Sequence, residues 1–257
     1  MVAACVALPL AAAPMSQSEA IVRLLNSRSS QSADLYEEAA VRVAADARLG
    51  MPLQRYMLAV LQGAEGLPLA ACLDEATRTE YLEGSRKRIV QLAENRGNPL
   101  ALYLMSMENN DVDLLRRAAY GGNVQALNAY GTYLIEKGMG ADPADTNLVA
   151  SLLNEAFVRF SAAASRKDAN GLYNLGMCYM EGIGCERNRR LAFENIREAA
   201  LAGHPDAMGD VALCYEKGVG VQESAAASLR WNMRARAAKG DKAAEEWLKA
   251  NAIPEDD

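Results

Sequence analysis

The 257-residue sequence has few aromatic side chains and little β-type alternation. Aromatic residues make up 6% of the chain although apolar residues make up 51%, so the core has to be built mainly from small and aliphatic side chains. Runs in which Val, Ile or Thr alternate with polar residues are scarce, whereas the helix-favouring residues Ala, Leu, Glu, Arg and Met are common. The composition predicts an all-α protein.

Histidine is nearly absent, since His204 is the only one in the chain. No HExxH zinc motif and no cluster of histidine ligands can therefore form. His204 stands directly before Pro205, at a turn between two expected helices, so we expect it to cap a helix rather than to serve in a catalytic triad. The Gly-x-Gly motifs follow helices instead of strands, and no Lys-Ser/Thr follows them, which argues against a phosphate-binding loop.

The chain also lacks an excess of positive charge and any long apolar run. Its net charge is −6 at pH 7, so no overall field attracts nucleic acid, and we expect no nucleic-acid partner. The short basic runs at 85–88 and 186–190 are expected to be solvated helix surface. No stretch of 18 consecutive apolar residues occurs, so we expect no transmembrane helix.

Residues 2–14 form an uncharged apolar segment, VAACVALPLAAAP, and polar residues follow it. Such a run, with alanines at 11–13, is typical of the hydrophobic part and cleavage zone of a signal peptide. We therefore expect residues 1–15 to be an export segment and the protein to be periplasmic. No Lys or Arg precedes the run, so a cytoplasmic protein is the alternative. The sequence VAAC also resembles a lipobox that ends at Cys5.

Four cysteines lie beyond that segment, namely Cys72, Cys178, Cys185 and Cys214. None of them belongs to a CxxC pair, so a zinc site is not expected. Disulfides can form in an oxidising compartment, but nothing in the spacing requires them. We expect buried free thiols, with disulfides as the alternative.

The second half of the chain repeats itself. CYMEGIGC begins at Cys178 and CYEKGVGV begins at Cys214, 36 residues later. Three segments, which start at Ala118, Ala163 and Ala199, share an Ala pair, a polar turn and a small residue in mid-helix. Each then closes with a Gly-x-Gly turn. The small residues in mid-helix are Gly131, Gly176 and Ala212, and the turns are Gly138/Gly140, Gly182/Gly184 and Gly218/Gly220.

Each of these shared features has a physical reason. A glycine inside a helix costs about 1 kcal/mol against alanine, so Gly131 and Gly176 indicate close approach of a neighbouring helix. A Gly-x-Gly turn ends a helix with a residue in the left-handed conformation. After the first turn, Asp142 is expected to cap the next helix, with Pro143 at its first position. Each repeat is therefore a helical hairpin, and stacked hairpins bury the apolar faces that one hairpin leaves open.

This pattern resembles the Sel-one-like repeat (SLR) family of the tetratricopeptide-like superfamily, with most of its characteristic positions present. The matching residues are Leu175, Gly176, Tyr179, Gly182, Gly184, Ala199, Ala200 and Gly203, and then Ala207, Val211, Tyr215, Gly218, Gly220 and Val221. The resemblance implies an α-α superhelix, a solenoid of antiparallel helical hairpins. It also implies a non-catalytic adaptor that assembles protein complexes.

The repeats predict how the chain is organised. RLGMPLQRYML from Arg48 and NRGNPLALYLM from Asn95 align with each other, so 16–110 is expected to hold degenerate hairpins and a cap helix. Residues 111–251 are expected to hold the clear repeats and a closing helix from Asp241, and the acidic tail 252–257 is expected to be disordered.

No group of residues converges as catalysis would require, so we predict a non-enzyme without cofactor or metal. Asp111 and Asp113 lack the Gly and closing Glu of a calcium loop, so Asp111 is expected to cap a helix. By analogy with tetratricopeptide geometry, we predict a monomer that binds a peptide or helix of a partner protein in a concave groove. Its exposed first-helix residues would be Gln125, Asn128, Thr132, Asn170, Tyr173, Met177, Asp206 and Leu213.

Other interpretations of the sequence remain open. Met177 and Leu213 can instead pack against the next hairpin. The protein can be a structural part of an envelope or secretion complex. A cell-wall or β-lactam-binding relative is disfavoured, because those relatives place paired cysteines in both helices of each repeat and this chain does not.

Overall fold

The computed structural model describes residues 16–25, 33–64 and 71–251. The expected export segment and acidic tail lie outside these described residues. The described residues form thirteen helices and no strand, which confirms the all-α prediction. The helices are α1 Gln17–Leu25, α2 Ala33–Arg48, α3 Pro52–Ala64, α4 Glu75–Arg96, α5 Pro99–Asn109, α6 Val112–Tyr120, α7 Val124–Met139, α8 Thr146–Ala164, α9 Ala169–Glu181, α10 Arg189–Leu201, α11 Pro205–Lys217, α12 Ala225–Ala238 and α13 Lys242–Ala250.

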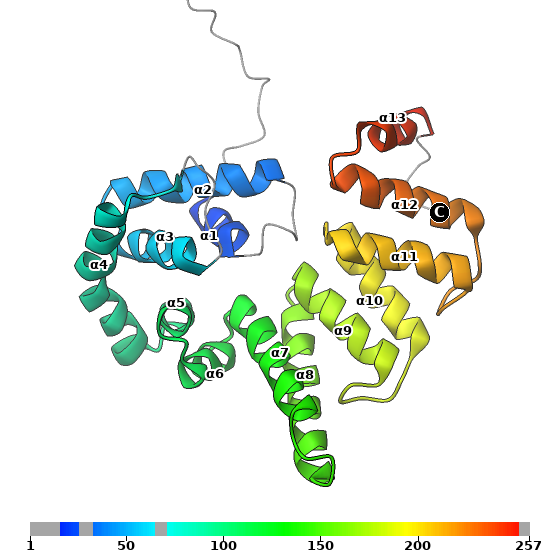
Figure 1. The fold of residues 1–257 in the computed structure, drawn as a ribbon, viewed down its shortest axis with the longest axis horizontal. Helices are drawn as coiled ribbons and strands as arrows, with labels where there is room; N and C mark the ends of the chain where they lie inside the picture. The colour runs from blue at the N-terminus through cyan, green and yellow to red at the C-terminus, as the bar shows by residue number, and fades with distance from the viewer. Residues whose placement is uncertain (1–15, 26–32, 65–70, 252–257) are drawn as a thin grey trace, which may run out of the picture.

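The helices pack mainly against their neighbours in the chain. α3 packs on α4, α5 on α6, α7 on α8, α9 on α10 and α11 on α12, and the second helix of each hairpin contacts the first helix of the next. Figure 1 shows the hairpins following one another along an arc from α1 to α13. Packing between sequence neighbours is the mark of a solenoid, so the predicted superhelix of hairpins is confirmed.

The mid-helix glycines lie where two helices of a hairpin touch. A Cβ atom at Gly131 would lie 2.6 Å from Cε1 of Phe160 on α8, and one at Gly176 would lie 2.6 Å from Cγ1 of Ile196 on α10. Neither position has room for a methyl group without a shift of the neighbour. The expected close approach of the helices is therefore confirmed.

The Gly-x-Gly turns do more than end a helix. Gly182 and Gly218 are left-handed C-caps with φ values of 77° and 63°, as predicted. The second glycine contacts the preceding hairpin, because a Cβ at Gly184 would lie 2.2 Å from the backbone oxygen of Leu153 on α8. In the first repeat the prediction is wrong, since the cap is Gly140 and its φ of −88° is right-handed.

The expected cap of α8 is also wrong. The helix starts at Thr146, and Asp145 is its N-cap. Asp142 instead closes a turn before the helix, where its carboxylate accepts a hydrogen bond of 2.9 Å from the backbone N–H of Ala144. An aspartate that bonds to the backbone two residues on stabilises a turn, and Pro143 lies inside that turn rather than in the helix.

The N-terminal third contains hairpins of the same kind. Gly50 and Gly97 both adopt the left-handed conformation, with φ values of 89° and 57°. Pro52 and Pro99 then begin α3 and α5, as the alignment of the two segments suggests. At the ends of the stack, α1 packs on α2 and α13 packs on α12.

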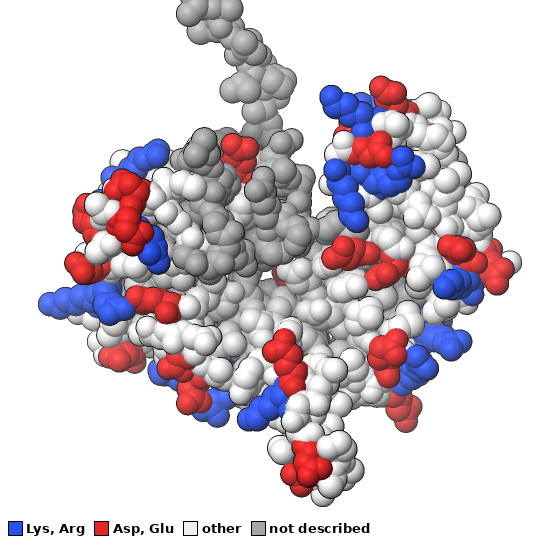
Figure 2. Space-filling model, in the orientation of Figure 1, with Lys and Arg blue, Asp and Glu red and all other residues white. Residues whose placement is uncertain are grey.

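Figure 2 shows acidic and basic side chains intermixed around this face of the molecule. Within residues 16–25, 33–64 and 71–251, no helix combines the length and the apolar character needed to cross a membrane.

Candidate partner-binding surface

The first helices of the clear repeats, α7, α9 and α11, carry all eight of the predicted binding residues. Thr132, Asp206 and Leu213 are exposed, and Asn128, Asn170, Tyr173 and Met177 are half-buried. The expected exposure of Gln125 is wrong, because only 9% of its surface is accessible. Gln125 lies in the first turn of α7, directly after the short connection from α6, and α6 packs against this helix.

Asn128 ties α7 to the start of α9. Its side-chain N–H donates a hydrogen bond of 2.7 Å to the carboxylate of Asp168. The same carboxylate oxygen caps α9 by accepting a bond of 2.8 Å from the backbone N–H of Gly171. The polar group of Asn128 that sequence reasoning assigned to a partner is thus used between two repeats.

Tyr173 makes the corresponding link from α9 to α11. Its hydroxyl donates a hydrogen bond of 2.9 Å to the carboxylate of Asp210. Burial, together with this bond, raises the pKa of Tyr173 above its ordinary value. The tyrosine ring also stacks on the imidazole of His204, with 4.4 Å between the ring centroids. Tyr173 therefore joins consecutive repeats.

His204 caps α11, as predicted. Its Nδ1 atom accepts a hydrogen bond of 3.2 Å from the backbone N–H of Ala207. Burial lowers the pKa of His204, although the carboxylates of Asp206, Asp210 and Asp168 act in the opposite direction. The imidazole is therefore held in the neutral form that can accept the capping bond.

An apolar slot opens between α9 and α11. It has a volume of about 200 Å³ and is lined by Met177 and Met180 of α9, Ile196 of α10, Asp210, Leu213, Cys214 and Lys217 of α11, and Val219. Met177 and Leu213 are the two apolar residues among the predicted set, and the fold brings them to the same slot. Leu213 remains 44% exposed, so the side chains line an opening on the surface.

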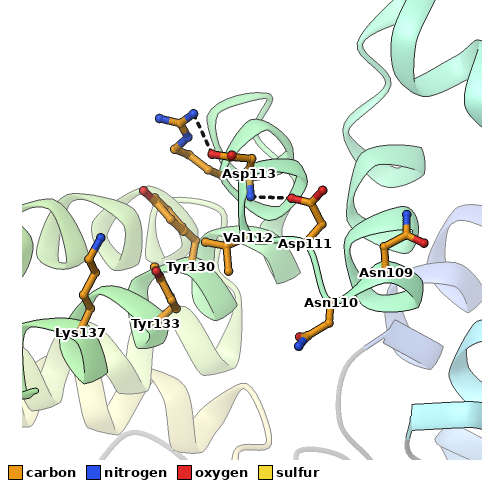
Figure 3. Close-up of a pocket in the computed structure, with 9 residues that line it drawn as sticks. Asn109, Asn110, Asp111, Val112, Asp113, Tyr130, Tyr133 and Lys137 are labelled. Atoms are coloured by element: carbon orange, nitrogen blue, oxygen red, sulfur yellow. Dashed lines mark hydrogen bonds and ion pairs between the residues drawn. The ribbon is translucent and has the colours of Figure 1, made fainter.

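A second hollow, which we call the notch, lies between α7 and the turn that joins α5 to α6. It has a volume of about 540 Å³ and is lined by Asn109, Asn110, Asp111, Val112, Asp113, Arg116, Tyr130, Tyr133 and Lys137 (Figure 3). Sequence reasoning missed this hollow. The feature of the sequence that could have indicated the notch is the difference in length between the α5–α6 and α7–α8 hairpins.

The acidic residues of the notch act within the protein. The carboxylate of Asp111 accepts bonds from the backbone N–H groups of Asp113 and Leu114, which confirms its predicted role as a cap. Asp113 forms an ion pair of 3.0 Å with Arg116. Within the described ranges, no three Asp, Glu, His or Cys side chains gather as a metal ion would need.

Cys178, Cys185 and Cys214 are free thiols. Cys178 and Cys214 are buried, and burial raises the pKa of the Cys178 thiol to about 12. The thiol of Cys185 donates to the backbone oxygen of Cys178 at 3.5 Å. Cys72 is exposed. A thiol with a raised pKa is a poor nucleophile at neutral pH, so Cys178 has a packing role.

The structure is a stack of helical hairpins in which the first helix of each clear repeat contributes to one exposed face. This arrangement defines an α-α superhelical repeat protein. The family model described as the Sel1 repeat matches residues 124–148, 169–204 and 205–231. These three segments, which lie within α7–α12, are therefore Sel1 repeats. Sel1 repeats generally act as scaffolds for protein–protein interaction. No curated protein matches the chain.

Two solved structures are similar to this chain. A Sel1 repeat protein from Oxalobacter formigenes is 21% identical, and the match covers 49% of this chain and 90% of that one, with a TM-score of 0.43. A protective antigen of uropathogenic Escherichia coli strains, which displays an SLR fold, is 17% identical over 83% of this chain, with a TM-score of 0.53. The match covers 45% of the antigen's length. The second likeness extends the SLR fold beyond the three matched segments.

Proposed function

We propose that the protein is a non-catalytic scaffold that binds a peptide or helix of a partner protein on the face formed by α7, α9 and α11. The observation that carries this proposal is the open apolar slot between α9 and α11. A partner would insert one apolar side chain there, between Met177 and Leu213.

The size of the slot favours a side chain over a whole small molecule. Sites for small ligands usually have volumes of about 300–1,000 Å³, whereas the slot has about 200 Å³. Methionine side chains such as Met177 and Met180 adapt their shape to different apolar groups. Anchoring of one side chain in a pocket is the usual source of binding energy at a protein interface.

The test is capture of the partner from native lysate by the full chain and by two matched variants. Leu213→Asp places a charge at the rim of the slot, and Leu148→Asp places the same charge on α8, where Leu148 is 47% exposed. We expect Leu148→Asp to capture as much partner as the parent protein and Leu213→Asp to capture at least about tenfold less. The reason is that the partner's apolar side chain would have to bury the new charge when it enters the slot.

Circular dichroism of both variants serves as the control for folding. Equal capture by the two folded variants would contradict the proposal and move the binding surface away from the slot. A variant of Asn128 or Tyr173 is a poorer test, since both side chains also hold repeats together.

We also propose that the protein is exported. The support is the apolar sequence 2–14, which lies outside the described residues. Cell fractionation, combined with the intact mass of the native protein, tests this. A periplasmic chain shortened by about 13 residues is the expected result. A full-length chain in the membrane fraction would favour a structural role in the envelope instead, and a full-length cytoplasmic chain would contradict export.

A further inference from the structure

The notch exists because two neighbouring hairpins differ in length. α5 and α6 contain 11 and 9 residues, whereas α7 and α8 contain 16 and 19. The C-terminal half of α7 therefore runs past the turn between α5 and α6. Figure 1 shows the α7–α8 hairpin projecting beyond its neighbours. One face of α7, with Tyr130, Tyr133 and Lys137 at helical spacing, is left beside that turn.

The hydrogen-bond donors on this face of α7 have no acceptor within the described chain. The hydroxyls of Tyr130 and Tyr133 make no hydrogen bond to another described residue, and Lys137 makes no ion pair with one. Burial raises the pKa of Tyr130, so its hydroxyl keeps its proton and remains a donor. By contrast, the acids of the notch are satisfied, since Asp111 caps α6 and Asp113 pairs with Arg116.

The three donors also point in one direction. The rings of Tyr130 and Tyr133 are stacked with 6.0 Å between centroids and an angle of 16°, so their planes are nearly parallel. The ammonium of Lys137 lies 5.9 Å from the centroid of the Tyr133 ring. Figure 3 shows both hydroxyls and the ammonium on the same side of α7. A group that accepts hydrogen bonds and carries negative charge complements this arrangement.

We propose that the notch binds an acidic segment of the partner protein, with a carboxylate bound by Lys137 and the hydroxyls of Tyr130 and Tyr133. This rests on the proposed function, because it takes the ligand to be part of a protein. A volume of about 540 Å³ leaves room for more than the single side chain of the slot. Lys137 is the one cation of the lining without an ion pair among the described residues, and a single cation suits a carboxylate better than a phosphate group, which is usually bound by a cluster of arginines.

The test uses an acetylated and amidated tetra-glutamate peptide and the full chain labelled with ¹³C-tyrosine. We expect the peptide to shift the NMR signals of Tyr130 and Tyr133 to saturation, and salt to weaken the effect. Tetra-glutamine, which has the same shape without the charge, should leave the signals unchanged. Lys137→Ala combined with Tyr133→Phe should weaken binding at least about tenfold, since it removes a charged and a neutral bond.

Lys87→Ala is the matched control, because Lys87 is exposed on α4, away from the notch residues. It should bind tetra-glutamate like the parent protein. Three results would each overturn the proposal. They are unchanged binding of tetra-glutamate by the Lys137→Ala and Tyr133→Phe double variant, binding of tetra-glutamine, and binding of inorganic phosphate that is stronger than that of the peptide. Leu213→Asp should still bind the peptide, so failure of the notch and failure of the slot can be told apart.

Discussion

At the scale of single residues, small side chains set how closely the helices of a hairpin approach. Gly176 faces Ile196 of α10 at a distance that excludes a methyl group. A glycine in the middle of a repeated helix is visible in the sequence, and so the contact could be predicted. The identity of the facing residue could not, because it depends on the register of two helices.

We predict that Gly176→Ala lowers the free energy of unfolding by about 1–3 kcal/mol, because the new methyl group would lie 2.6 Å from Cγ1 of Ile196. The same change at Gly209 on α11 is the control, since a Cβ there meets nothing within 4 Å. Gly209→Ala should raise the free energy of unfolding by about 0.5–1 kcal/mol. Urea unfolding measures both, and equal effects would contradict the packing role of Gly176.

His204 gives the fold a dependence on pH. Burial lowers its pKa in the folded state, so below about pH 6.5 the unfolded chain binds a proton that the folded chain resists. Stability should therefore fall as the pH drops below about 6.5, by at most about 1.4 kcal/mol per pH unit from this residue. His204→Asn keeps an acceptor for the N–H of Ala207 without a titrating group. Urea unfolding of this variant between pH 7.5 and 5 should show less loss of stability than the parent, and an unchanged profile would exclude His204 as the cause.

At the scale of helices and turns, the sequence predicts most of the second half of the chain. The caps at Asp111 and His204 and the left-handed turns at Gly182 and Gly218 could be predicted because each depends on local chemistry alone. The start of α8 could not, since the Asp142 carboxylate can bond the backbone either of a helix start or of a turn, and in the structure it bonds that of a turn. Local patterns do not decide between a turn and a cap a few residues apart.

Tyrosine hydroxyls on the first helices provide a matched test of the links between repeats. Tyr173→Phe removes the bond to Asp210 between α9 and α11, and we expect it to lower the free energy of unfolding by about 1.5 kcal/mol. Tyr133→Phe makes the same change at a hydroxyl without a partner among the described residues. It should change stability by less than about 0.5 kcal/mol. Urea unfolding of the two variants measures the difference, and similar losses would contradict the role of the Tyr173 bond.

At the scale of the whole molecule, the arc of hairpins creates surfaces that no single repeat contains. The slot needs residues from α9, α10 and α11, and the notch needs a long hairpin next to a short one. Sequence reasoning placed Met177 and Leu213 on the right helices. It could not predict that the side chains of Asn128 and Tyr173 form hydrogen bonds to the next repeat, or that Gln125 is buried. These contacts depend on how the hairpins stack.

The central claim is that the partner binds at the slot between α9 and α11. Its most direct test is photo-crosslinking in cells, with benzoylphenylalanine placed singly at Met177 or Leu213 and, as controls, at Leu148 or Val158 of α8. Val158 and Leu148 are 45% and 47% exposed, close to the 44% of Leu213, so these three probes are similarly accessible. We predict that both slot positions crosslink the same partner protein and that neither control does. Crosslinks to a common partner from α8 alone would contradict the account.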